Sequence, residues 1–243
     1  MNMIFNPAVH DIISFKRHKL NKGFIQSNNM SEDKGQVKGK GVRHVMKSLL
    51  DMPVGSHTLL VYPDLATLRE VYAKYISMNS HGTSELLVIL PYYETVESVK
   101  NNIMNGDSHM DKYKEMVHEG SLILRDCHDI IHGNGKSFDV SSNNDENEIE
   151  RLGRFLKQML FHAKKIGKNT VSLWIDTGAF HTSEMDSDSL IKYEKCIPSE
   201  FRNSSIKQFC LYHQMDFELR FDRIKEKQIL DSHDKKLLML DNV

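Results

Sequence analysis

The sequence predicts an α/β fold: a three-layer sandwich in which helices cover both faces of a central, mostly parallel sheet. Two observations predict it. From about Val42 onward, short apolar runs alternate with amphipathic helical stretches. The apolar runs are continuous rather than alternating with polar residues, which is typical of strands buried on both faces. Ligands of such sheets usually bind outside the carboxyl ends of the strands.

Five apolar runs bounded by turn residues are predicted strands, at 57–63, 85–91, 121–126, 170–176 and 205–213. Apolar stripes at helical spacing predict helices between them. Asp64 is placed to cap one of these helices, and Pro53 and Gly55 end another. The predicted helices cover 42–50, 64–79, 93–104, 108–118, 146–167 and 217–240, the last of them broken, and a loop is expected around 128–140.

Charge is distributed unevenly along the chain. The formal net charge is −1, but residues 1–50 hold nine Lys/Arg and three acidic residues, which is +6 and leaves −7 for residues 51–243. Residues 21–42 are rich in Gly, Lys, Asn and Ser and carry few apolar side chains, so they cannot offset the entropy of ordering. We therefore expect a flexible basic arm over residues 1–44 and a folded domain over residues 45–243.

Cysteine usage and hydropathy indicate a soluble cytoplasmic protein that does not insert into a membrane. The three cysteines form no CxxC pair and no repeated spacing, which suits a reducing compartment. No apolar run approaches the roughly 18 residues needed to span a bilayer. The first residues show no basic start followed by a long apolar stretch, so no secretion signal is predicted.

Gly135-Lys136-Ser137 matches the end of the phosphate-binding loop of nucleotide hydrolases. That loop requires glycine where this chain has Ile130, and it requires a helix directly after the serine. Turn-forming residues follow Ser137 instead. Asp176, at the end of an apolar run, therefore has no nucleotide-bound magnesium to hold, although residual nucleotide binding stays open as an alternative.

Other constellations give no catalytic, metal or cofactor site. His128 and His132 are four residues apart and follow Cys127, but no second ligand pair accompanies them. No nucleophile elbow of the G-x-S-x-G type occurs. Cys210 lies within an apolar run, where a thiol is normally inert. The sequence therefore predicts no enzyme, no metal ion and no cofactor.

A series of short motifs runs in order from about Leu49 to Leu240. Its residues are Pro53, Gly55, Ser56, His57, Tyr62, Asp64, Gly135, Phe138, Asp139, Tyr193, Glu194, Cys210, Tyr212 and His233. This series resembles the MEDS family, a sensory domain named after methanogens, methylotrophs and the dichloromethane-responsive repressor. Val54 stands where the family usually has Trp.

The resemblance implies a RecA/KaiC-like fold that has lost its phosphate loop. It also implies a non-catalytic sensor of a small organic ligand, working with a histidine kinase or a transcriptional regulator, and homodimerisation is left open. A regulator that contacts nucleic acid through the basic arm is a further alternative. The predicted ligand site lies at the carboxyl edge of the sheet, with His57 and Glu194 as polar contacts and with Tyr62, Trp174, Asp176, Tyr193 and Tyr212 around it.

Overall fold

A computed structural model describes residues 36–38, 42–78, 84–104, 110–133, 147–181, 187–201 and 204–239 of the 243-residue chain. The chain divides into two compact units, Met1–Lys34 and Gly35–Val243, and every described residue belongs to the second unit. The predicted arm over 1–44 lies mostly outside the described residues. Within it, however, Gln36–Lys38 form a strand of the sheet, so the folded unit begins before the predicted boundary.

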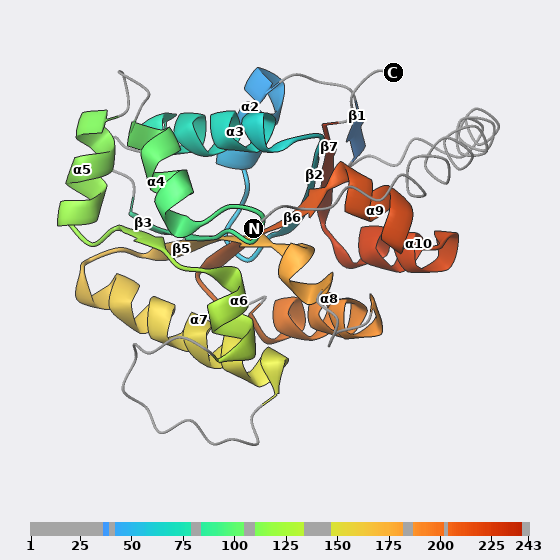
Figure 1. Ribbon diagram of the computed structural model, residues 1–243. Helices are drawn as coiled ribbons and strands as arrows, with labels where there is room; N and C mark the ends of the chain where they lie inside the picture. Colours follow the sequence, from blue (N-terminus) through green and yellow to red (C-terminus); the bar gives the residue numbers. More distant parts are fainter. Residues whose placement is uncertain are drawn as a thin grey trace, which may run out of the picture. The chain divides into compact units, whose positions relative to one another are not determined.

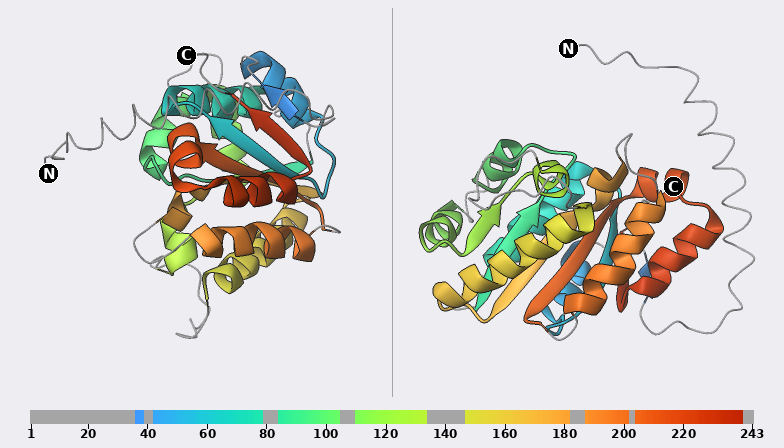
Figure 2. Two further views of the ribbon diagram at one scale, coloured as in Figure 1. Left: turned by 90° about the vertical axis from the view of Figure 1, so that its right-hand side faces the viewer. Right: turned by 90° about the horizontal axis from the view of Figure 1, so that it is seen from below.

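Seven strands of the described residues form one parallel sheet at the centre of this unit (Figure 1). The strand order is β1-β7-β2-β6-β5-β3-β4, and every pairing is parallel. Helices lie on both faces, which confirms the predicted three-layer α/β sandwich (Figure 2). The strands are β1 Gln36–Lys38, β2 His57–Tyr62, β3 Glu85–Leu90, β4 Leu122–Leu124, β5 Thr170–Asp176, β6 Ile206–His213 and β7 Lys235–Leu238.

The helices divide between the two faces in chain order. One face carries α2 Val42–Leu50, α3 Leu65–Met78, α4 Val96–Met104 and α5 Met110–His118. The opposite face carries α6 Cys127–His132, α7 Glu148–Lys165, α8 Ser187–Phe201 and, beside α8, α10 Arg223–Ser232. A short 3-10 helix, η1 Thr177–His181, follows β5, and α9 Gln214–Arg220 follows β6.

The strands separate two apolar cores. Every residue of β2 and β5 is buried, because helices cover both faces of the sheet. Successive side chains point to opposite faces. Leu59 and Val61 therefore join the core beneath α6–α8, whereas Leu60 and Tyr62 join the core beneath α2–α5.

Two predictions of secondary structure were wrong. The expected loop around 128–140 begins with helix α6, because the Asp126 carboxylate accepts hydrogen bonds from two backbone amides of its first turn and Gly133 ends it in the left-handed conformation. The expected helix over 217–240 is α9, α10 and then strand β7. The strand pairs with β2, and tertiary pairing overrides the weak strand propensity of its two lysines.

A buried ion pair spans three strands of the sheet. Lys207 of β6 contacts the Glu85 carboxylate of β3, and each side chain is 10% exposed. Ser172 of β5, which lies between them, donates to Glu85 Oε2 at 2.7 Å, and Tyr75 donates to the same oxygen at 3.1 Å. These hydrogen bonds satisfy the carboxylate, which is the condition for burying such a pair at moderate cost.

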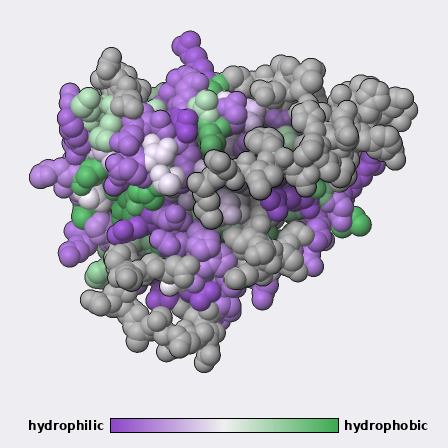
Figure 3. All heavy atoms as spheres, viewed as in Figure 1, coloured by the Kyte–Doolittle hydropathy of each residue, from purple (hydrophilic) through white to green (hydrophobic). Residues whose placement is uncertain are grey.

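None of the described helices is long and apolar enough to cross a membrane. The described part of the face drawn in Figure 3 is largely hydrophilic, and apolar side chains reach it in small separate groups.

Candidate functional site

The structure distributes the seven predicted ligand-site residues over three places. His57, Tyr193, Glu194 and Tyr212 meet in a buried polar cluster on the α8 side of the sheet. Tyr62 and Asp176 meet at the carboxyl edge on the α3 side. Trp174 belongs to the core. The prediction of one common site at the carboxyl edge is therefore not what the structure shows, since His57 is the first residue of β2 and so lies at the opposite end of that strand.

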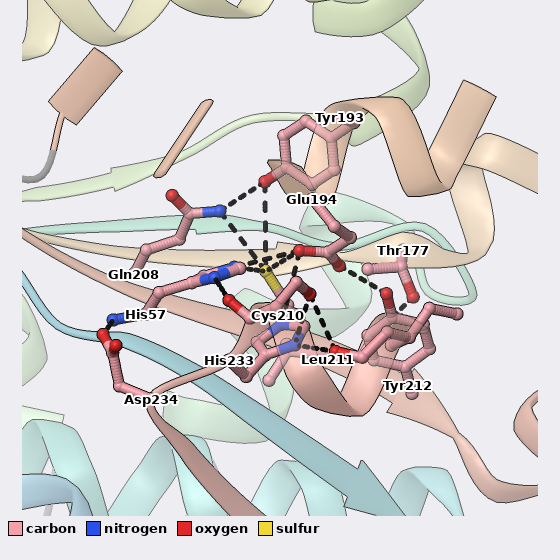
Figure 4. A network of polar contacts seen from close by, with 12 residues as sticks. His57, Thr177, Tyr193, Glu194, Gln208, Cys210, Leu211, Tyr212, His233 and Asp234 are labelled. Atoms are coloured by element: carbon pink, nitrogen blue, oxygen red, sulfur yellow. Dashed lines mark hydrogen bonds and ion pairs between the residues drawn. The ribbon is translucent and has the colours of Figure 1, made fainter. Parts of the chain in front are cut away.

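Four potential metal ligands converge in the buried cluster, which we call the His–Glu–Cys centre: His57, Glu194, Cys210 and His233. One ligand atom from each lies within 4.8 Å of the others, and all four residues are buried. His57 Nε2 lies 2.9 Å from Glu194 Oε2 and 3.2 Å from Cys210 Sγ (Figure 4). His233 Nε2 lies 3.3 Å from the same Glu194 oxygen.

Backbone carbonyls orient both imidazole rings of the centre. His57 Nδ1 contacts the carbonyl oxygen of Ser232 at 2.9 Å, and His233 Nδ1 contacts the carbonyl oxygen of Ile229 at 2.6 Å. A carbonyl oxygen can only accept, so each Nδ1 carries the proton and each Nε2 turns its other site towards Glu194. The rings stack with centroids 3.9 Å apart.

Tyrosine and glutamine side chains complete the surroundings of the centre. The Tyr212 hydroxyl donates to Glu194 Oε1, so the carboxylate is held from its far side. Gln208 Nε2 donates to the Tyr193 hydroxyl at 2.7 Å and lies 3.3 Å from Cys210 Sγ. The Tyr193 hydroxyl lies 4.0 Å from that sulfur. Two donors are therefore directed at the Cys210 sulfur.

Burial and neighbouring groups set the charges within the centre. Burial by itself raises the pKa of Glu194, but the rings of His233 and His57 outweigh burial and hold that pKa below its usual range. Burial lowers the pKa of His233, although Glu194 opposes the shift. Burial also raises the pKa of the Cys210 thiol. An ionised carboxylate thus faces a neutral ring and an uncharged thiol.

A second polar cluster, the carboxyl-edge group, consists of Tyr62, Tyr72, Glu94 and Asp176. Tyr62 ends β2 and Asp176 ends β5, the two strands on either side of β6, and Glu94 follows β3. The Tyr62 hydroxyl donates to Asp176 Oδ2 at 3.4 Å. The Tyr72 hydroxyl and Glu94 Oε1 are buried and have no hydrogen-bond partner among the described residues.

Asp176 is the most perturbed acid of the carboxyl-edge group. Its side chain is 1% exposed, and burial raises its pKa to about 7. The backbone amide of Gly178, which donates to Oδ1 at 3.1 Å, and the Tyr62 hydroxyl oppose that rise, whereas the Glu94 charge adds to it. Asp176 therefore changes charge near neutral pH, where an ordinary aspartate stays ionised.

Aromatic rings gather at the same edge. Tyr62 and His213 meet edge to face with centroids 5.3 Å apart, and the Tyr93 ring lies 5.6 Å from that of His213. A Cβ on Gly178 would come within 2.6 Å of ring atoms of both Tyr92 and Tyr93. Glycine at position 178 therefore allows these two half-buried rings to pack against the end of β5.

Trp174 lies in the core between α3 and the sheet, fully buried, with ring centroids 4.8 Å from Tyr75 and 4.6 Å from Phe209. Its predicted role as a ligand contact is replaced by a packing role. An open groove of about 1010 Å³ lies between α2 and α3, but none of the seven predicted residues lines it.

No described strand is followed by a phosphate-binding loop. Only Pro63 and Asp64 separate β2 from α3, and α9 begins directly after β6. The Gly135-Lys136-Ser137 triplet lies outside the described residues. The rings of His128 and His132 are 4.4 Å apart on α6, and this pair is not part of the group of potential metal ligands found among the described residues.

No known protein-family model and no curated protein matches this chain. The resemblance to the MEDS family consequently stays a prediction. Inference about function therefore rests on the geometry of the two clusters.

Sequence reasoning included His57 and Glu194 among the site residues but missed Cys210 and His233. Cys210 was interpreted as an inert thiol, and His233 entered only as a motif residue of the resembled family. His57 and Cys210 are 153 residues apart in the sequence. The four ligands come from β2, α8, β6 and the residue that follows α10. Local spacing carries no sign of such a site. The sequence signal that could have indicated this site is the position of its polar residues, which lie inside or beside runs that are otherwise fully apolar.

Proposed function

We propose that this domain is a non-catalytic sensory module that binds a small organic ligand at the carboxyl-edge group and passes the signal to a partner, a histidine kinase or a transcriptional regulator. One observation carries the proposal. Two buried polar atoms near the carboxyl group of Asp176, the Tyr72 hydroxyl and Glu94 Oε1, have no hydrogen-bond partner within the described part of the chain. Buried polar groups without partners are costly, and a ligand that hydrogen-bonds to them removes this cost.

The position and composition of the group support the same proposal. It lies at the carboxyl ends of β2, β5 and β3, parallel strands of one sheet, and ligands of α/β sheets usually bind at this edge. Carboxylate and hydroxyl oxygens supply acceptors, while the rings of Tyr92, Tyr93 and His213 supply apolar area. The chemistry fits a small molecule with an apolar body and at least one hydrogen-bond donor. The resemblance to the MEDS family supports a sensory role in particular.

The proposal is tested by mass spectrometry of the small molecules released when the purified protein is denatured. A compound identified in this way is then titrated into the protein while the fluorescence of Trp174, the chain's single tryptophan, is followed. Trp174 reports on the group because its ring centroid lies 5.7 Å from that of Tyr72.

The titration is repeated with two variants of the carboxyl-edge group and one control variant. Asp176→Asn and Tyr72→Phe should each weaken binding by about 10-fold, the effect of losing one hydrogen bond of about 1.4 kcal/mol. Tyr113→Phe is the matched control, because Tyr113 is also buried in the core beneath α2–α5 but is not part of the carboxyl-edge group. Equal affinities in all three variants would refute a ligand site at this edge.

A further inference from the structure

We propose that His57, Glu194, Cys210 and His233 bind one divalent transition-metal ion of the zinc type in a closed, four-coordinate site. The proposal goes beyond the sensory function proposed above and does not depend on it. The His–Glu–Cys centre lies on the α8 side of the sheet, whereas the carboxyl-edge group lies on the α3 side. Each can be tested with the other left intact.

The distances between the ligand atoms suit a metal ion. Ligand bonds of 2.0–2.3 Å in a tetrahedron place neighbouring ligand atoms roughly 3.3–3.7 Å apart. Glu194 Oε2 lies 3.3 Å from His233 Nε2 and 3.5 Å from Cys210 Sγ, and His57 Nε2 lies 3.2 Å from that sulfur. Both contacts of His57 Nε2, 2.9 Å to Glu194 Oε2 and 3.2 Å to Cys210 Sγ, must widen by a few tenths of an ångström.

The hydrogen bonds around the centre match those that metal ligands make. Both histidines donate from Nδ1 to backbone carbonyls, which fixes the tautomer that presents Nε2 to a metal. The Tyr212 hydroxyl holds the second oxygen of Glu194, as outer partners of ligating carboxylates do. The donors of Gln208 and Tyr193 directed at Cys210 would stabilise a metal-bound thiolate.

Protonation without a metal ion explains the close contacts of the His–Glu–Cys centre less well than a bound metal ion does. Both Nε2 atoms face the same oxygen, Glu194 Oε2, and a proton placed on either ring or on the carboxyl group bridges only one of these contacts. In the other contact, a nitrogen lone pair then faces the carboxylate oxygen without a proton between them, and this repulsion is costly in a buried site. His233 Nε2 lies 3.3 Å from Glu194 Oε2 but makes no well-directed hydrogen bond to any described residue. One metal ion satisfies both nitrogens, the carboxylate and the sulfur together.

Ligand type and burial define the class of metal and its role. Two imidazoles, a carboxylate and a thiolate favour zinc over magnesium or calcium, which prefer oxygen ligands. The four residues are at most 3% exposed, so the site has no open position for a substrate. The metal would instead link β2, α8, β6 and the junction between α10 and β7, and thereby stabilise the fold.

The test uses the full-length chain, stripped of metal with a chelator and titrated with cobalt(II), whose spectrum reports on ligands and coordination number. We expect uptake of one equivalent, visible absorption typical of a tetrahedral site and a thiolate-to-cobalt charge-transfer band. Zinc should then displace the cobalt and shift the denaturant midpoint of the protein upward. Failure of the wild-type protein to bind either ion at one equivalent would overturn the proposal.

Matched cysteine variants locate the site. Cys210→Ser should abolish the charge-transfer band and weaken binding by more than about 100-fold, because a direct ligand matters at least as much as an outer partner. Cys127→Ser, which removes another fully buried thiol from the same core, should leave both unchanged. If Cys210→Ser does not fold, Gln208→Leu serves instead and should weaken binding by about 10–100-fold. A band that survives in Cys210→Ser, or affinity unchanged in Gln208→Leu, would contradict the assignment.

Discussion

Replacing Asp176 by asparagine should remove a large pH dependence from the stability of this protein. Asp176 is buried, and its pKa rises from 3.8 to about 7 in the folded chain. Between these two values the folded protein holds a proton that the unfolded chain has released. Folding therefore takes up a proton in this window, and stability falls as the pH rises through it.

The size of the effect follows from the shift. About three pKa units correspond to about 4 kcal/mol of unfolding free energy, present below about pH 4 and lost by about pH 7. In Asp176→Asn the side chain carries no charge at any pH, so this loss disappears. The amide N–H₂ group adds a penalty of about 1–2 kcal/mol for an unmatched donor, but this penalty is the same at every pH.

Urea denaturation followed by the fluorescence of Trp174 measures this difference directly. The wild-type protein, Asp176→Asn and the exposed control Asp231→Asn are compared across the window from about pH 4 to about pH 8. The stability of Asp176→Asn relative to wild type should increase across the window by about 4 kcal/mol, whereas Asp231→Asn should run parallel to wild type. A difference between Asp176→Asn and wild type that stays constant with pH would refute the reasoning.

Three further changes have expected outcomes in the same denaturation assay. Tyr72→Phe should stabilise the ligand-free protein by about 1–2 kcal/mol because it removes a buried hydroxyl that no described residue satisfies, and a loss of stability would contradict this. Gly178→Ala should destabilise by about 1–3 kcal/mol because its Cβ would meet two tyrosine rings at 2.6 Å, and a neutral result would show that these rings yield freely. Lys207→Met should cost about 3–5 kcal/mol by leaving the Glu85 carboxylate buried without its cation, and the double change with Glu85→Gln should recover part of this loss.

The sequence predicted the parts of the fold in which local pattern and tertiary environment agree. β2 and β5 are continuous apolar runs because helices cover both faces of the sheet, and each was placed to within a residue. Helix α7 was predicted from its apolar stripe, which is the face that it buries.

The missed elements are those in which a long-range partner decides the structure. Strand β7 begins with Lys235 and Lys236, and pairing with β2 makes it a strand. The strand at 36–38 has a polar sequence and pairs only with β7, so composition assigned it to the arm. Helix α6 is the exception, because its six residues depend on a local signal, the cap at Asp126, within a segment rich in turn-forming residues.

Most individual residues of the candidate sites could be predicted from the sequence, but their grouping into two clusters could not. Six of the seven chosen side chains belong to one of two polar clusters, since polar and aromatic residues at the ends of buried strands are a sound signal. Their division between the clusters follows from which face each side chain takes. Tyr62 and Tyr212 both lie near strand ends, yet Tyr62 points to the α3 side and Tyr212 to the α8 side. A one-residue change in register reverses that assignment, and sequence alone does not determine register so finely.

The His–Glu–Cys centre also bears on why the protein keeps so polar a core. An ionised carboxylate, two imidazoles and a thiol occupy space beneath α8 where apolar side chains would fold at lower cost. Stability alone therefore does not explain these residues, whereas a bound metal ion does, because it converts the same four side chains into links between distant parts of the chain. The carboxyl-edge group follows the same logic on the other face, with Tyr72 and Glu94 in place of the metal ligands. In both proposals, a ligand that binds only the folded chain would raise the free energy of unfolding of the protein.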